Sequence, residues 1–183
     1  LESIEGLSNL TEVDGEFNLS FLPKLERLTG LENLERVGVQ LSFFQVDQLQ
    51  DLDGLDSLTE VGALSIGPAA ELASIDGLPR LTVIEGGLSL DSLPALDDLT
   101  PLASVTRVGS LRLAGELAGD PSDLRGLTEV EGTVVVEQTD ITDLDWLVGI
   151  EQTGLWLSGN PLLTDVSAIA GTTTLDELGL VDN

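Results

Sequence analysis

The stretch Leu72-Ala-Ser-Ile75-Asp-Gly-Leu78-Pro-Arg-Leu81-Thr-Val-Ile84-Glu-Gly-Gly-Leu88-Ser-Leu90 decides the fold of this chain. Its apolar residues recur at every third position as far as Ile84 and then at every second position, Leu88 and Leu90. The twofold part is typical of a short strand whose alternate side chains point inward. The threefold part lacks the spacing of an amphipathic α-helix and favours a tight, turning coil.

The same pattern returns along the chain. Copies begin at Leu1, Leu25, Leu49 and Leu72, so the repeat is 23 or 24 residues long, which lies within the roughly 20–29 residues of leucine-rich repeats. Looser copies follow from Leu96, Leu124, Leu144 and Val166. One coil cannot bury its own apolar edge, whereas a stack of coils can. The sequence therefore predicts a mainly β, right-handed leucine-rich solenoid of about eight coils of 20–25 residues, with a parallel sheet on one face. We expect a single domain over residues 1–183.

A glycine precedes one leucine in many of the copies. These glycines are Gly6, Gly30, Gly54, Gly77 and Gly126. Because glycine adopts positive φ at no steric cost, the repeated Gly-Leu predicts a turn with a left-handed backbone.

The repeat resembles the receptor L-domain and its bacterial relatives. The best matches are Leu1–Leu19, Leu25–Phe43, Leu49–Ile66 and Leu72–Leu90. The C-terminal stretch Leu155–Ile169 looks like the internalin type of bacterial leucine-rich repeat. The inward asparagine usual in such repeats occurs only at Asn160 and Asn183. The equivalent places hold Leu22, Val46, Ala69, Leu93, Glu116 and Thr139. The resemblance implies a solenoid that displays a recognition face. Receptor-type cysteine modules are missing, so signalling is not implied.

Composition excludes several classes of partner and of chemistry. The formal net charge is −26, from 33 acidic and 7 basic residues. Such a surface repels nucleic acid and anionic lipid, so neither is an expected partner. No run of 18 apolar residues occurs, so we expect no membrane insertion by this segment. The chain has no Cys and no His, which removes disulfides, thiolate sites and the commonest general base.

Aligned strands give a middle row of outward residues. The row is Asn18, Ser42, Ser65, Ser89, Arg112, Val135 and Trp156. Because Trp and Arg are enriched at binding hot spots, Arg112, Val135 and Trp156 are candidate partner-binding residues. The alternatives are a neighbouring loop that covers Trp156, or a register slip that turns it inward. Phe44, with Phe21, is a candidate for a second, smaller patch.

Two further segments depart from the repeat. The stretch Ala114–Asp123 lengthens one coil and is either a functional loop or a degenerate turn. The acids Asp140, Asp143 and Asp145 are the candidate for a calcium site, and the alternative is a solvated turn. No established calcium-loop motif accompanies them, so no cofactor is otherwise expected.

These observations predict a non-catalytic recognition module of a bacterial cell-surface or secreted protein. We expect it to bind a protein or glycan partner through its sheet face, in an extracellular or cell-surface setting. Because the chain has no initiator Met and both ends read as open coils without polar caps, we expect it to be a fragment of a larger protein. The alternative is a structural spacer or assembly module that self-associates through open coil ends.

Overall fold

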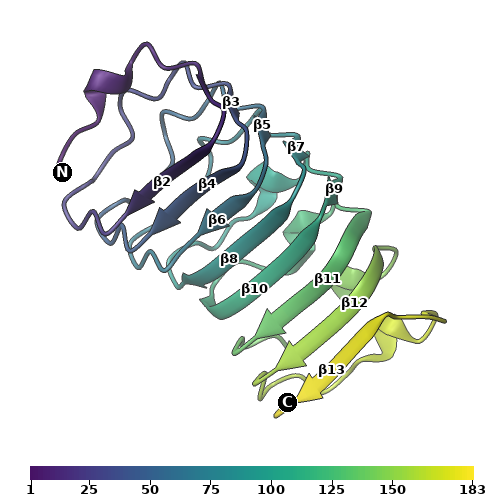
Figure 1. Cartoon of the computed structure of the whole chain (residues 1–183). Helices are drawn as coiled ribbons and strands as arrows, with labels where there is room; N and C mark the ends of the chain where they lie inside the picture. Colours follow the sequence, from purple (N-terminus) through teal and green to yellow (C-terminus); the bar gives the residue numbers. More distant parts are fainter.

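Strands from successive repeats lie side by side in one parallel sheet that runs the length of the molecule (Figure 1). The computed structural model describes all residues from Leu1 to Asn183. Along the sheet the strands are β2 (Glu16–Ser20), β4 (Gln40–Phe44), β6 (Leu64–Ile66), β8 (Gly87–Leu93), β10 (Ser110–Leu117), β11 (Glu129–Glu137), β12 (Glu151–Ser158) and β13 (Glu177–Val181). This confirms a mainly β solenoid with a parallel sheet on one face. It makes about seven turns, against the expected eight coils.

The other two sides of the coil carry shorter elements. A second sheet is formed by the two-residue strands β1 (Glu12–Val13), β3 (Arg36–Val37), β5 (Glu60–Val61) and β7 (Val83–Ile84), while β9 (Arg107–Val108) pairs with β11. The third side holds turns and the 3-10 helices η1 (Glu5–Leu7), η2 (Thr100–Leu102), η3 (Pro121–Leu124), η4 (Asp145–Leu147) and η5 (Ser167–Ile169). No α-helix forms, as the threefold spacing predicts. None of the helices has the length and apolarity that a membrane crossing requires.

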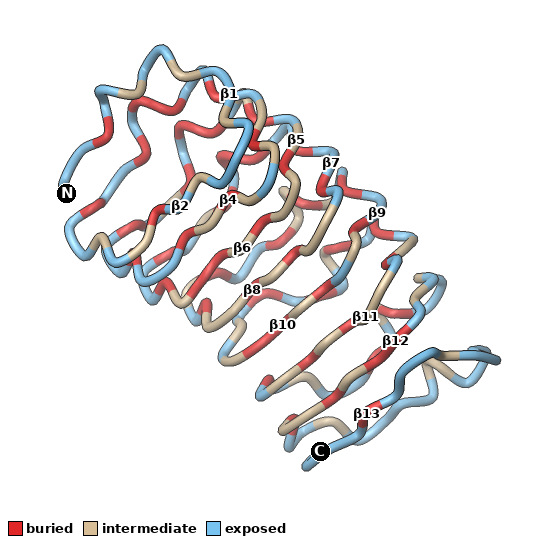
Figure 2. The backbone as a smooth tube through the Cα atoms, in the orientation of Figure 1, coloured by how far each residue is buried: buried red, intermediate tan, exposed pale blue.

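The repeating leucines point into one continuous interior. A single cluster of 42 buried hydrophobic residues runs from Ile4 to Leu157. In Figure 2 buried positions recur along the coils between β2 and β12, while exposed positions dominate the first and last coils. Each fully buried Leu or Ile contributes roughly 1.5–3 kcal/mol of burial free energy, largely offset by chain entropy. Stacking therefore supplies the core that one coil lacks.

Four of the five Gly-Leu glycines, all except Gly6, lie where successive coils approach each other closely. Only Gly30 and Gly54 have a left-handed backbone, with φ of 111° and 108°. Gly6, Gly77 and Gly126 do not, so the prediction of positive φ is wrong there. A Cβ built on Gly77 would lie 1.9 Å from the carbonyl oxygen of Leu52 in the coil before it, and one built on Gly126 would lie 1.8 Å from that of Ala103. No side chain fits at that separation.

Inward polar side chains replace apolar ones in the last coils, where Asn160 is fully buried. Its side-chain amide donates to the carbonyl oxygen of Val136 at 3.0 Å, and its Oδ1 accepts from the Thr139 hydroxyl at 2.7 Å. Asn183 repeats the arrangement one coil later and donates to the carbonyl oxygen of Leu157 at 2.9 Å. At both positions the asparagine side chain thus satisfies backbone groups at the turn.

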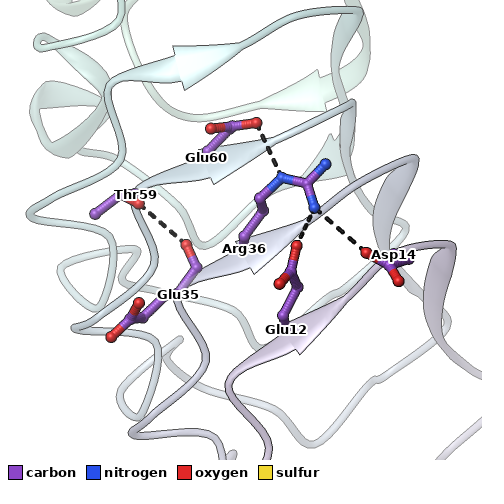
Figure 3. A network of polar contacts seen from close by, with 6 residues as sticks. All are labelled: Glu12, Asp14, Glu35, Arg36, Thr59 and Glu60. Carbon is purple, nitrogen blue, oxygen red and sulfur yellow. Dashed lines mark hydrogen bonds and ion pairs between the residues drawn. The ribbon is translucent and has the colours of Figure 1, made fainter.

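Cross-coil ion pairs connect the short strands of the second sheet. Figure 3 shows Arg36 of β3 between Glu12 of β1 and Glu60 of β5. Arg36 donates to Glu60 at 3.1 Å and to Glu12, and it lies 3.6 Å from Asp14. The hydrogen bonds to Glu60 and to Glu12 raise the pKa of Arg36 above its ordinary value. One cation thus offsets the like-charge repulsion that a net charge of −26 brings between neighbouring coils.

Candidate binding surface

The outward side of the long sheet, called here the sheet face, carries the predicted middle row in the predicted register. Strand pairing places Asn18, Ser42, Ser65, Ser89, Arg112, Val135 and Trp156 opposite one another in succession, and Gly179 of β13 continues the row. The neighbours of Trp156 in its own strand, Leu155 and Leu157, are fully buried. Trp156 therefore points outward, and the alternative of a register slip is wrong.

Trp156 lies across the next strand and helps to line a shallow depression. Gly179 is buried beneath it, and a Cβ built on Gly179 would lie 2.2 Å from Cε3 of the indole. The six-membered ring therefore rests on the glycine, and a larger residue would lift it. The depression has a volume of about 410 Å³ and is lined by Thr133, Val135, Glu137, Trp156 and Glu177. Two of the predicted residues, Val135 and Trp156, thus meet in one place.

Arg112 adjoins this depression and is held by two carboxylates. Its Nη2 lies 3.1 Å from Glu137 and 3.7 Å from Asp91, which belong to the strands on either side. Its other terminal nitrogen, Nη1, is buried without a hydrogen-bond partner. The main contacts of the Arg112 guanidinium are therefore with neighbouring strands: it offsets the charge of Asp91 and Glu137, and it positions Glu137, which lines the depression.

Phe44 lies apart from the other candidates. It is 37% exposed and packs edge-to-face on Phe21, with 5.2 Å between the ring centroids. β4 and β12 are separated by five strand steps in the sheet order, or roughly 24 Å at about 4.8 Å per step. The predicted Phe21–Phe44 patch exists as a contact, but the structure does not bring Phe44 to Arg112, Val135 and Trp156.

The acids Asp140, Asp143 and Asp145 do not come together as metal ligands. The structure has no group of three or more acidic side chains arranged to hold a metal ion. The Asp143 carboxylate accepts hydrogen bonds from the backbone N–H of Asp145 and from the Thr142 hydroxyl, both at 3.1 Å. All three acids are exposed, so the segment is a solvated turn, which is the alternative that the sequence left open.

The same three acids nevertheless line a second hollow, called here the edge cavity, near the carboxyl ends of β10 and β11. Its volume is about 440 Å³. Its wall includes Asp120 from the irregular segment Ala114–Asp123, and Trp146 of η4. Sequence reasoning missed Trp146, although it directly follows Asp145 in the acidic stretch. It also missed Glu177, whose position before Leu178 in the last repeat places it outward beside Trp156.

Carboxylates in the turns respond to their immediate surroundings. The neighbouring Asp51 carboxylate, with smaller contributions from burial, Asp56 and Asp76, raises the pKa of Asp53. The hydroxyl and backbone N–H of Thr100 lower the pKa of Asp98. These shifts arise from crowding and capping at exposed turns, and none lies at the sheet-face depression.

A scan of the chain against protein-family models and a search of curated proteins find no match.

Proposed function

We propose that this chain is a non-catalytic recognition module of a bacterial surface or secreted protein, which binds a protein or glycan through its sheet face. The observation that carries the proposal is Trp156, which rests on Gly179 beside Val135 in an open depression. A half-buried indole held in one orientation loses little entropy on binding, and such residues dominate many interfaces. An indole face beside carboxylates also suits sugar rings, whose hydroxyls donate to acids.

The fold type that we propose is a right-handed leucine-rich repeat, similar to the receptor L-domain and, at its end, to internalins. Three features support it: the repeat of 23 or 24 residues, the close coil contacts at Gly-Leu, and the inward ladder of Asn160 and Asn183. The same resemblance supports an extracellular or cell-surface setting. A chain without His or Cys offers few groups for catalysis, which supports a binding role over an enzymatic one.

A glycan array and a pull-down from surface extracts, both with Trp156→Ala, test the sheet face. Loss of a hot-spot tryptophan costs about 2 kcal/mol or more, so we expect captured ligand to bind at least roughly 30-fold more weakly. Arg112→Ala releases Glu137 and is expected to weaken binding less. The matched control is Val83→Ala, which truncates a 41% exposed residue on β7 of the second sheet. Full binding by both sheet-face variants would overturn the proposal.

An assembly role, in which the end coils of two copies stack on each other, is a second candidate, because stacking of coils is what builds the core of this fold. Light scattering over a range of concentrations separates the two roles: a ladder of oligomers supports assembly, and a monomer at high concentration removes it.

A further inference from the structure

We propose that the edge cavity is a second binding site, one that accepts the cationic group of a basic side chain, either guanidinium or alkylammonium. The inference concerns a different surface from the sheet-face depression and does not depend on it. It brings together two segments, Ala114–Asp123 and Asp140–Asp145, that the sheet-face proposal leaves without a role.

A bulge in β10 builds one wall of the cavity. The strand pairing places Ala114 opposite Asp91 but Leu117 opposite Leu93, so three steps on one strand match two on the other. The inward position assigned to Glu116 is therefore taken by Leu117, which is a correction to the sequence alignment. A bulge of this kind re-aims the chain and is frequent beside functional sites. Here Leu117 stays half-buried and lines the cavity.

The segment after the bulge is held in place by a helix cap and a close packing contact. Asp120 caps η3 by accepting a hydrogen bond from the backbone N–H of Ser122 at 2.8 Å. Gly119 is buried, and a Cβ built on it would lie 2.8 Å from Cγ of Leu99 in the coil before it. The wall is thus defined by its own contacts. The opposite wall comes from the next coil, where η4 presents Trp146.

Charge around the cavity is of one sign. Four carboxylates line it, those of Asp120, Asp140, Asp143 and Asp145, and no lysine or arginine does. Arg112, the base on β10, is paired with Asp91 and Glu137 on the sheet face. A cation that enters therefore meets attraction from several sides.

The rest of the lining favours an organic cation over an inorganic one. A metal ion needs several oxygens converging on one point, and no such group exists. In contrast, Leu117, Ile141 and Trp146 supply an apolar and aromatic wall. Aliphatic stems pack on such a wall, and cations bind favourably over an indole ring. The volume of about 440 Å³ lies within the range of roughly 300–1,000 Å³ seen for ligand pockets.

Titration with N-acetyl-arginine amide, followed by the indole N–H signals in a ¹⁵N-labelled sample, tests the site. The chain has two tryptophans, so the signals of Trp146 and Trp156 are assigned by one substitution. We expect the Trp146 signal to shift saturably and the Trp156 signal to stay in place. N-acetyl-citrulline amide has the same shape without the charge and is expected to cause no saturable shift.

A second experiment removes negative charge from the lining of the edge cavity. The pair Asp140→Asn and Asp145→Asn is expected to raise the dissociation constant for the arginine amide roughly tenfold, equivalent to about 1.4 kcal/mol. The matched control is Asp47→Asn with Asp76→Asn, which removes the same charge from exposed turns outside the cavity. Equal weakening by both pairs, equal binding of the citrulline amide, or displacement of the arginine amide by equimolar calcium would each overturn the proposal.

Discussion

Replacing Gly54 by alanine tests the close stacking of the coils on which the whole fold depends. Gly54 has a φ of 108°, a backbone conformation that costs a residue with a Cβ about 1–3 kcal/mol. The added Cβ would also lie 2.8 Å from the carbonyl oxygen of Leu28, a backbone atom that cannot move without shifting its coil. Overpacking of this kind costs about 1–3 kcal/mol.

The two costs together predict that Gly54→Ala lowers the free energy of unfolding by roughly 2–6 kcal/mol. For a chain of this size, about 2–4 °C of melting temperature accompanies each kcal/mol, so we expect a fall of at least roughly 4 °C. Urea titration and thermal melting, both followed by far-UV circular dichroism, measure the two quantities.

Gly6→Ala is the matched control, because Gly6 occupies the same motif position in the first coil. A Cβ built on it meets nothing within 4 Å, and its φ is not left-handed. We expect a change within about 0.5 kcal/mol, as for other exposed sites. If both substitutions change stability equally, or if Gly54→Ala is neutral, contact between successive coils is not what selects glycine here.

Four further perturbations test individual features of the structure. Gly179→Ala is expected to lift the indole of Trp156 and weaken ligand binding at the sheet face while both tryptophans remain; unchanged binding and an unchanged Trp156 indole signal would contradict the contact. Asn160→Leu leaves the carbonyl oxygen of Val136 and the backbone N–H of Thr139 without their partner. We therefore expect the free energy of unfolding in urea titration to fall by roughly 2–4 kcal/mol, and an unchanged value would refute the role of the Asn160 hydrogen bonds. Asp53→Asn is expected to raise the melting temperature at pH 7, because a raised folded pKa means that ionised Asp53 destabilises the fold; the gain should vanish below the ordinary pKa of about 3.9. Asp98→Asn should lower the melting temperature at pH 7, because a lowered pKa in the folded state means that ionised Asp98 stabilises the fold. The difference from the unsubstituted chain should vanish as the pH falls through the pKa of Asp98 in the folded state, and a higher melting temperature at pH 7 would contradict the assignment.

The interior was predictable from sequence because one rule governs it. Positions spaced by three and then by two residues all point to a common axis, so Leu19, Leu90 and Leu157 could be placed in one core before any coordinates. The outward row followed from the same register, since strands that repeat every coil must pair in parallel. Local periodicity and long-range stacking agree in this fold, which is why the leucines carry so much information.

The sites were less predictable because they arise where the rule is broken. The bulge before Leu117 shifts the alignment by one residue, which periodicity alone cannot reveal. Trp146 lies in a short 3-10 helix, where no repeat assigns an inward or outward side. The need for Gly77 comes from the carbonyl of Leu52, a residue 25 positions earlier whose proximity only the stacked coil creates.

The departures from the regular repeat discussed above lie in the C-terminal half of the chain. The outward row is polar and small as far as Ser89, and its charged, apolar and aromatic members begin at Arg112. The bulge and both tryptophans fall in the same half of the chain. Departures from a regular repeat persist in proteins mainly where function requires them. Because Trp156 lines the sheet-face depression and Trp146 the edge cavity, each indole reports on its own site, and failure of one proposal leaves the other standing.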